Sequence, residues 1–324
     1  MTGRRKASVP ELVERAREGD ARAVARLISL VEDASPLLRE VMAGLAPHAG
    51  HAQVVGVTGS PGVGKSTSTN ALVTALRKAG KRVGVLAVDP SSPFSGGALL
   101  GDRVRMQDHA LDKDVYIRSM ASRGHLGGLS WSTPQALRVL DAAGCDVILV
   151  ETVGVGQSEV EIAGLADTTL VLLAPGMGDG IQAAKAGILE IGDLYVVNKA
   201  DRDGADTVRR DLRNMLALAD RGDATDYWRP PIVLTVAQTG QGVDEVVEKI
   251  EAHRAWMESS GELNRRRARR ARDEIEAIAV TALRARWGDV HTRTELDELA
   301  DQVVAGKTDP YAAADVLLAA YAEE

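Results

Sequence analysis

A glycine-rich octapeptide constrains the fold of this chain more than any other feature. Residues 59–66, GSPGVGKS, match the pattern G-x-x-x-x-G-K-[ST] of a phosphate-binding loop (P-loop). The β-branched run QVVGVT (53–58) precedes them directly, and the helix-compatible run STSTNALVTALRKAG (66–80) follows. Because a strand, this loop and a helix in that order form a nucleotide-binding unit, we expect such a unit at 53–80.

The residue types of the loop suit phosphate binding. Glycines let backbone N–H groups turn inward and approach a phosphate closely, and the helix that follows directs its positive end at the same point. Lys65 then faces the β- and γ-phosphates, and Ser66 can bind Mg²⁺. The predicted nucleotide contacts in this segment are Gly59, Ser60, Pro61, Gly62, Val63, Gly64, Lys65, Ser66 and Thr67.

Five further β-branched runs alternate with helix-compatible sequence. They are RVGVLAVD (82–89), DVILVE (146–151), TLVLLAP (169–175), LYVVN (194–198) and PIVLT (231–235). Continuously apolar strands that alternate with helices indicate a parallel sheet covered on both faces. We therefore expect an α/β fold with a mostly parallel central sheet, whose strand order the sequence does not reveal.

The tetrapeptide Asn198-Lys199-Ala200-Asp201 closes the run LYVVN, at a carboxyl end of the predicted sheet, where open α/β sheets bind ligands. The Asp201 carboxylate can accept hydrogen bonds from both N1–H and N2–H₂ of guanine, whereas adenine has an acceptor at N1. We therefore predict GTP or GDP rather than ATP, with Asn198, Lys199 and Asp201 as base-binding residues.

Three acidic residues are candidate magnesium ligands beside Ser66. Glu151 follows DVILV at the position and spacing of the D-x-x-G element of GTPases, with Glu in place of Asp; the alternative is a helix cap or a surface residue. Asp89, in VDPSS, stands at the end of the second predicted strand. Asp102 lies in the Gly-rich stretch GDRVRM, and the residues alone leave it open between the metal and the surface. A carboxylate at a strand end facing the P-loop would bind Mg²⁺ or its water.

Val155 follows Gly154, where Ras-like GTPases have the Gln that orients the attacking water. Slow intrinsic hydrolysis is therefore expected. Gln157 is the alternative for this role, although a position at the top of a helix is the favoured interpretation. Segments 91–105 and 176–186 have the Gly and Ser content of loops that reorder around a γ-phosphate.

Helical periodicity characterises both ends of the chain. Apolar residues at helical spacing predict two or three short helices in 8–46 and a helical tail in 274–322. Between a predicted helix at 243–259 and that tail, ESSGELN (258–264) is expected to be a connector. The expected divisions are an N-terminal helical extension (1–50), a nucleotide-binding domain (51–260) and a C-terminal helical arm (261–324).

Composition excludes several other classes of protein. A formal charge of −7 and only 1 Phe, 4 Trp and 5 Tyr argue against nucleic acid as a partner. No apolar run approaches the roughly 20 residues of a membrane span. The single Cys145 excludes internal disulfides and suits a reducing compartment, so we expect a cytoplasmic protein. His48 and His51 are three apart, but a solvated turn is favoured over a metal site.

The arginine-rich segment 265–272 has two interpretations. Six arginines fall within these eight positions. A solvated helix face is favoured, because long Arg side chains cover apolar surface while their charged groups stay in water. A surface for an acidic partner is the alternative.

The segments GSPGVGKST, VDPSSPFSGGALLGDRVRM, SRGHLGGLS, ETVGVGQSE and NKAD, in this order, resemble the MeaB/ArgK family, GTPase chaperones of adenosylcobalamin-dependent methylmalonyl-CoA mutase. The resemblance covers roughly residues 8–320. It implies a P-loop NTPase of the signal-recognition/MinD-like class whose C-terminal arm forms a homodimer. It also implies GTP hydrolysis coupled to delivery of adenosylcobalamin to the mutase and to protection of that enzyme, with cobalamin adenosyltransferase as a further candidate partner.

The resemblance also assigns individual residues. The family's magnesium ligands fall on Ser66, Asp89, Asp102 and Glu151, which favours the metal for Asp102, and Lys65, Asp102 and Glu151 form the expected catalytic set. Asp179 and Lys185 match positions in a mobile loop that signals the nucleotide state.

The family's base-binding Ser-Ala-Leu falls on Val236-Ala237-Gln238. Val236 lacks the hydroxyl of that serine. The backbone N–H of Ala237 is still expected to reach guanine O6, so only a supporting contact differs.

Two other functions share part of this pattern. A P-loop kinase of the arginine/ornithine transport type is suggested by the older name of the family, but kinases usually use ATP, which the NKAD tetrapeptide disfavours. A nickel-insertion GTPase shares the fold class but requires Cys/His metal sites, which one Cys and 6 scattered His do not offer. A GTP-hydrolysing metallochaperone is therefore the expected function.

Overall fold

The chain divides into two compact units, which we name the core unit (residues 1–264) and the C-terminal unit (residues 265–324). Among the described residues no helix is both long and apolar enough to cross a membrane. The computed structural model describes residues 7–90, 106–109, 111–122, 132–152, 158–176, 189–219, 227–287 and 294–322.

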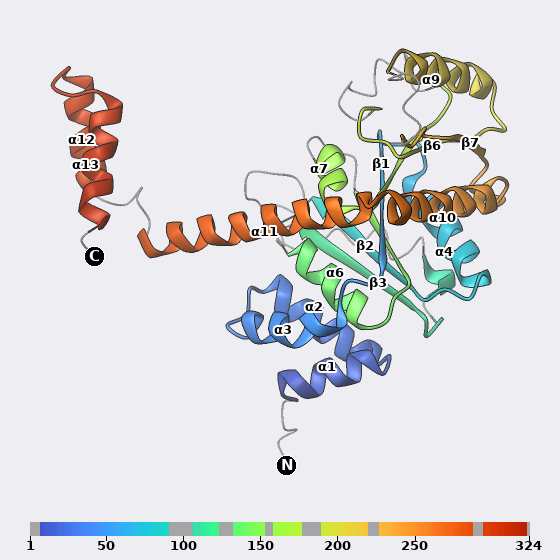
Figure 1. The fold of residues 1–324 in the computed structure, drawn as a ribbon, viewed down its shortest axis with the longest axis horizontal. Helices are drawn as coiled ribbons and strands as arrows, with labels where there is room; N and C mark the ends of the chain where they lie inside the picture. The colour runs from blue at the N-terminus through green and yellow to red at the C-terminus, as the bar shows by residue number, and fades with distance from the viewer. Residues whose placement is uncertain are drawn as a thin grey trace. The chain divides into compact units, whose positions relative to one another are not determined.

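A seven-stranded sheet forms the centre of the core unit (Figure 1). Its strand order is β3-β2-β4-β1-β5-β6-β7, and every neighbouring pair is parallel. The α/β fold with a parallel sheet is therefore confirmed. The strands are β1 (Gln53–Gly59), β2 (Val83–Pro90), β3 (Val115–Ser122), β4 (Val147–Thr152), β5 (Thr168–Leu173), β6 (Leu194–Asn198) and β7 (Ile232–Thr235).

Strand β3 was not predicted from the sequence. Among the described residues it pairs with β2 alone, from Val115 opposite Val83 to Ser122 opposite Pro90. An edge strand contacts one neighbour, so it need not be continuously apolar, and Arg118 interrupts the run VYIRSMAS. The periodicity of fully buried strands therefore does not identify it.

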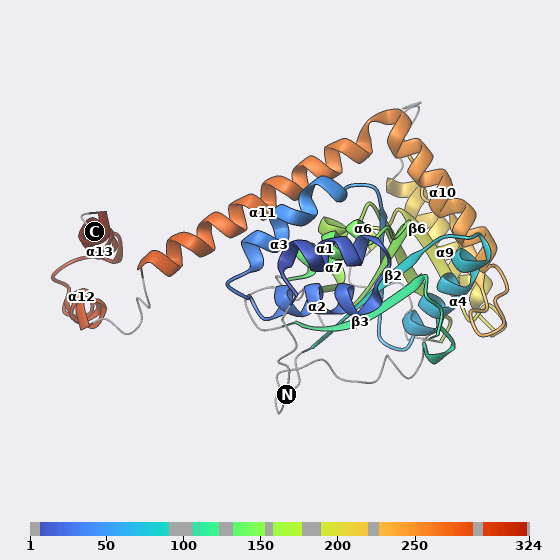
Figure 2. The ribbon, with the colours of Figure 1, turned by 90° about the horizontal axis from the view of Figure 1, so that it is seen from below.

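Helices cover both faces of the sheet because the side chains of each strand alternate between the faces (Figure 2). In β1, Val54 belongs to one hydrophobic cluster, and Val55 and Val57 belong to the other. The first cluster joins the sheet to α6 (Thr133–Ala142) and α7 (Ser158–Leu165). The second joins it to α4 (Lys65–Lys78) and α10 (Val243–Ser260), while α9 (Ala205–Ala219) packs against β6 and β7.

Three N-terminal helices belong to the core unit, as the sequence predicted for 8–46. They are α1 (Val9–Arg17), α2 (Ala21–Glu32) and α3 (Leu38–Leu45), followed by a short 3-10 turn, η1 (Ala46–His48). Ser8 and Glu11 form a reciprocal capping box on α1, which satisfies backbone N–H groups at its start. The three helices contact α6 and share its hydrophobic cluster.

The predicted connector at 258–264 is wrong. Helix α10 continues through Ser260, and α11 (Glu262–Trp287) begins after Gly261 alone. Gly261 has φ +73° and its N–H donates to Glu258 O, so a left-handed glycine ends one helix while the next begins at once. The polar residues of 258–264 are as common at helix ends as in linkers, so the composition of this segment does not distinguish the two.

The C-terminal unit is helical, as the periodicity of 274–322 predicted. It contains most of α11, with α12 (Thr294–Val304) and α13 (Pro310–Ala322), which contact each other. Of the six arginines in 265–272, three are exposed (265, 269 and 272) and three are partly buried (266, 267 and 270), so the segment is only in part a solvated face. Several large apolar side chains of this unit are also exposed, among them Ile275 (67 %) and Val316 (59 %).

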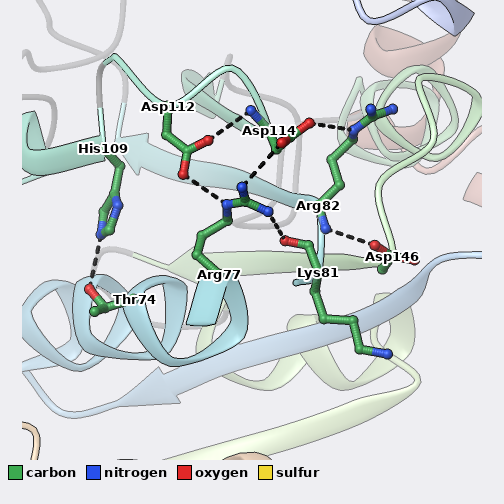
Figure 3. A network of polar contacts seen from close by, with 8 residues as sticks. All are labelled: Thr74, Arg77, Lys81, Arg82, His109, Asp112, Asp114 and Asp146. Atoms are coloured by element: carbon green, nitrogen blue, oxygen red, sulfur yellow. Dashed lines mark hydrogen bonds and ion pairs between the residues drawn. The ribbon is translucent and has the colours of Figure 1, made fainter. Parts of the chain in front are cut away.

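A polar network fastens the C-terminal end of α4 to the segments before β3 and β4 (Figure 3). Arg77 Nε donates to Asp112 Oδ2 (2.8 Å) and its Nη2 to Asp114 Oδ2 (3.1 Å). Arg82 Nε donates to Asp114 Oδ1 (3.3 Å). The hydrogen bond from Arg77 lowers the pKa of Asp112, and the Asp112 carboxylate in turn raises the pKa of Arg77.

Asp112→Asn is expected to lower the free energy of unfolding by about 0.5–1 kcal/mol at pH 7, because the network is partly exposed to water. The folded pKa of Asp112 lies below its unfolded value of about 3.9, so its contribution is complete above that pH and disappears as pH falls through the folded pKa. Urea denaturation between pH 7 and pH 2.5 measures this. The exposed Asp108→Asn is the control, and a deficit in Asp112→Asn that persists at the lowest pH contradicts the expectation.

Candidate nucleotide-binding site

The P-loop follows β1 in the structure and depends on glycine at two positions. Gly59 has φ +141°, and a Cβ there would lie 2.3 Å from the carbonyl oxygen of Leu172 on β5. Gly64 has φ +96°, and a Cβ there would lie 2.6 Å from Asn198 Nδ2. A side chain at either position would meet polar atoms of neighbouring strands, so the loop can follow this path only with glycine.

Lys65 and Ser66 form the first turn of α4, and both are largely buried, with exposed fractions of 8 % each. Lys65 Nζ donates to the carbonyl oxygens of Gly59 (2.6 Å) and Ser60 (3.3 Å), at the start of the loop. The ammonium group therefore lies across the P-loop, beside the helix N-terminus. Anions bind favourably at such a position because backbone N–H groups and a positive charge converge there.

Glu151 approaches the P-loop from the neighbouring strand β4. In the sheet it lies opposite Val57 of β1, and its side chain is 1 % exposed. Ser66 Oγ donates to Glu151 Oε1 at 2.6 Å. The structure thus places Glu151 in the core of the site rather than on the surface, which excludes the surface alternative.

The oxygen atoms of Ser66 and Glu151 are a suitable donor set for Mg²⁺, which prefers one or two protein ligands together with phosphate oxygens and water. Within the described parts of the chain, no three His, Cys, Asp or Glu side chains cluster in a way that would hold a metal ion. Ser66 and Glu151 therefore fit a metal whose other ligands include phosphate oxygens of a bound nucleotide.

Asp89 is placed only by its backbone. It lies at the carboxyl end of β2, two residues beyond Ala87, which pairs with Glu151. Its backbone therefore reaches the same edge of the sheet as the P-loop. Several further predicted residues lie outside the described residues: Asp102, Val155, Gln157, Asp179 and Lys185.

The tetrapeptide after β6 contacts the P-loop directly. Asn198 Nδ2 donates to the carbonyl oxygen of Val63 (2.9 Å), and Lys199 Nζ donates to that of Gly62 (2.7 Å). Lys199 has φ +57°, a conformation that few non-glycine residues adopt. Asp201 follows in the same turn and is exposed, so its carboxylate is accessible to a base.

The segment after β7 supports Asn198 from the other side. Asn198 Oδ1 accepts hydrogen bonds from Thr235 Oγ1 (3.2 Å) and from the backbone N–H of Ala237 (3.1 Å). In this structure the Ala237 amide is thus engaged by Asn198, and its expected contact with guanine O6 stays a prediction.

The turn at 236–242 brings the remaining predicted base-binding residues beside Asn198. Val236 N donates to Gln241 O (3.0 Å), which closes the turn, and Gln238 is exposed at its tip. A Cβ at Gly242 would lie 2.1 Å from Leu234 O, so glycine is required there.

Comparison with known proteins places this site in a family. Residues 24–291 match the family model described as methylmalonyl Co-A mutase-associated GTPase MeaB. A protein named as a GTPase in Pyrococcus abyssi is 48 % identical over 310 residues, covering 96 % of both chains. The mouse mitochondrial methylmalonic aciduria type A homolog is 36 % identical over 271 residues, covering 82 % of this chain and 65 % of its own. A solved structure titled LAO/AO transport system kinase superposes with a TM-score of 0.74 at 26 % identity, covering 98 % of each chain.

Proposed function

Because the chain belongs to the MeaB family of GTPases associated with methylmalonyl-CoA mutase, we propose that it binds GTP with Mg²⁺ and hydrolyses it. We further propose that this cycle gates the delivery of adenosylcobalamin to a methylmalonyl-CoA mutase and protects that enzyme. The main support for guanine-nucleotide binding is the direct contact between the tetrapeptide at 198–201 and the P-loop. Asn198 and Lys199 bind carbonyl oxygens of the P-loop, so the guanine-type tetrapeptide and the phosphate loop form one site.

In this proposal each group of the site has a defined part. The amides of the P-loop and Lys65 bind the β- and γ-phosphates and neutralise charge that develops during transfer. Ser66 and Glu151 would hold Mg²⁺, with Asp89 and Asp102 as further members of its shell. When bound, the metal would add to the neutralisation of phosphate charge that Lys65 provides. Asp201 accepts from guanine, and the segment Val236-Ala237-Gln238 borders the base.

The mutase as partner is supported by the description of the family and by the name of the mouse relative. Val155 stands where Ras-like GTPases have a water-orienting Gln, which is the reason to expect slow hydrolysis by the protein alone. A partner that orders the segments around the γ-phosphate would then accelerate the reaction. A cobalamin adenosyltransferase is a second candidate partner.

Purified methylmalonyl-CoA mutase from the same organism is expected to raise the GTP turnover of this protein by about 10²-fold or more. The coupling between nucleotide binding and mutase binding is reciprocal. The affinity for the mutase should therefore also differ between the GDP-bound protein and the protein bound to a non-hydrolysable GTP analogue. Asp179→Ala or Lys185→Ala should reduce the stimulation and leave basal turnover unchanged. Turnover that the mutase does not change, together with an affinity independent of the nucleotide, contradicts the chaperone proposal while leaving the GTPase proposal intact.

A phosphoryl-transfer function is the alternative, because the superposed structure is titled a transport system kinase. A kinase transfers the γ-phosphate to an acceptor, whereas a GTPase releases it as inorganic phosphate. Incubation with γ-labelled GTP and cell extract distinguishes the two. The arrangement of Asn198, Lys199 and Asp201 favours guanine, which supports the GTPase.

The proposal also includes a homodimer formed through the C-terminal unit, in a cytoplasmic setting. Exposed apolar side chains on α11 and α13, such as Ile275 and Val316, are the reason to expect a second copy against this unit. A reducing compartment suits the buried Cys145, whose thiol pKa is raised by burial.

Deletion of residues 262–324 is expected to give a monomer that still binds GDP, because the P-loop and the guanine-type tetrapeptide belong to the core unit. Light scattering at micromolar concentration measures the assembly, and titration with labelled GDP measures binding. A full-length protein that is monomeric under these conditions contradicts the dimer.

A further inference from the structure

A groove with a volume of about 320 Å³ lies at the β3 edge of the sheet, within the core unit. Residues 115–118 of β3 line it, and helix α2, which lies beside β3 (Figure 2), forms one wall with residues 21, 24, 25 and 28. Met106 and His109 line the other wall, and Leu140 of α6 also contributes. We name this site the edge groove.

Four consecutive residues of β3 line the edge groove. Successive side chains of a strand point to opposite faces of the sheet, so a pocket on one face would contact only alternate residues. Tyr116 belongs to the hydrophobic cluster on the face of α6, whereas Val115 and Ile117 pack against the cluster on the face of α4. The groove therefore follows the outer edge of β3, where it meets both faces and the backbone between them.

The backbone of β3 presents polar groups to this groove. The Val83 amide on β2 donates to the carbonyl oxygen of Asp114 (2.9 Å), so that carbonyl points toward β2. Because peptide groups alternate in direction along a strand, the N–H and C=O of Ile117 point away from β2. Neither group has a hydrogen-bond partner among the residues that the structure describes. A strand edge with unpaired groups is a template for a further strand.

The edge groove also has a buried hydroxyl that lacks a partner. Tyr116 is 6 % exposed, and its Oη has no hydrogen-bond partner in the described part of the chain. Burial raises the pKa of this hydroxyl, so it stays protonated at neutral pH and can donate. A buried donor without an acceptor costs free energy, which a ligand rich in carbonyl oxygens can recover.

Ion pairs neutralise the charges nearest to the groove. Arg118 lines it and pairs with Glu32 of α2. Asp20, whose side chain caps α2, pairs with Arg15. Among the described residues, no carboxylate lines the groove.

The other charged residues next to the lining are mainly positive. Arg22 and Arg26 each follow a lining alanine of α2, and both are exposed. Neither has an ion pair within the described ranges. Asp108, exposed beside His109, is the opposing carboxylate. Two guanidinium groups against one carboxylate favour a ligand with acidic residues at its ends.

From these observations we propose that the edge groove binds an extended segment of a partner protein, which joins the sheet beside β3 as a further strand. The backbone of this segment pairs with the N–H and C=O of Ile117. Its small apolar side chains lie against α2, and its acidic ends face Arg22 and Arg26. The groove admits one strand between two walls, whereas β3 of a second copy would bring its own α2 with it.

Two peptides test the proposal on the full-length protein saturated with GDP. One is the heptapeptide EVTVTVE, acetylated and amidated at its ends, and the other has the same sequence with a methyl group on every internal backbone nitrogen. The first should bind with a Kd of about 1 mM or tighter, as measured by fluorescence anisotropy. The methylated peptide should bind about tenfold more weakly or less, because it keeps the side chains but cannot pair as a strand. Amide hydrogen exchange should slow in β3 when the first peptide binds.

Ala25→Glu places a longer, negatively charged side chain in the groove, and it should weaken binding of the first peptide about tenfold. Ala43→Glu is the matched control, because Ala43 is exposed on α3 and does not line the groove. Both variants should keep the GDP affinity of the unaltered protein, which reports that they fold.

Four results would overturn the proposal. They are no binding of the first peptide, equal binding of the two peptides, equal loss of binding in the two variants, and exchange that slows outside β3 alone. Exchange in β3 that slows with rising protein concentration and no peptide would also overturn it, because a second copy would then occupy the groove.

Discussion

Replacement of Glu151 by Gln is expected to slow GTP hydrolysis about 10²–10³-fold while GDP affinity changes little. The side chain is buried, accepts from Ser66 Oγ at 2.6 Å and stands at the magnesium position of the proposed site. Gln has the same shape without the charge, so it removes the attraction to the metal and leaves the P-loop amides and Lys65 in place. Loss of one preorganised electrostatic contact typically slows a reaction by this factor.

Single-turnover hydrolysis across a magnesium titration measures this effect, and labelled GDP measures the affinity. Glu190→Gln is the matched control, because Glu190 is exposed in the turn before β6. Ser66→Ala and the double variant complete a cycle. Because both residues are proposed to act on one metal, the double variant should lose less than the product of the two single losses. Hydrolysis by Glu151→Gln at the unaltered rate at every magnesium concentration would show that this carboxylate is structural.

Asp201→Asn is expected to weaken GDP binding by about 2–4 kcal/mol, roughly 30–1,000-fold, because two charge-assisted hydrogen bonds to guanine are lost. Xanthine presents an acceptor where guanine presents N2–H₂, so the variant should bind xanthosine diphosphate better than the unaltered protein does. The substitution lies on an exposed turn, so the fold should remain intact.

Titration of the unaltered protein and of Asp201→Asn with GDP, ADP and xanthosine diphosphate measures the change in specificity. Asp203→Asn is the control, since Asp203 is exposed two residues further along the same turn. Equal affinity of the unaltered protein for GDP and ADP would contradict the assignment of the base. Retained GDP affinity in Asp201→Asn would show that another residue selects the base.

Residues close together in the sequence could be interpreted without the structure. The octapeptide at 59–66 indicates its own conformation, because positions 59 and 64 have positive φ values that glycine adopts without strain. The tetrapeptide at 198–201 and six of the strands were also predicted, because each is marked by residues that are adjacent in the sequence. Strands β1, β4, β5 and β6 are buried on both faces, which is visible as uninterrupted apolar runs. Strand β7 lies at the sheet edge and is buried only at alternate residues, but its sequence IVLT is still a β-branched run.

Strand β3 and the junction at Gly261 could not be predicted in this way. Strand β3 lies at the sheet edge and is only partly buried, so its sequence lacks the apolar run. The connector at 258–264 has polar residues typical of both loops and helix ends, and the φ of Gly261 decides between them. The edge groove joins segments far apart in the chain, and no motif marks it.

The sequence by itself determined the α/β class, the phosphate loop and the preference for guanine, because each depends on residues within a few positions of one another. Only the tertiary structure decided how these parts form a site. Ser66 meets Glu151 across 85 positions, and Asn198 meets Val63 across 135. Such contacts depend on the order of the strands, which is set by packing between helices and sheet over the whole core unit rather than by any local pattern.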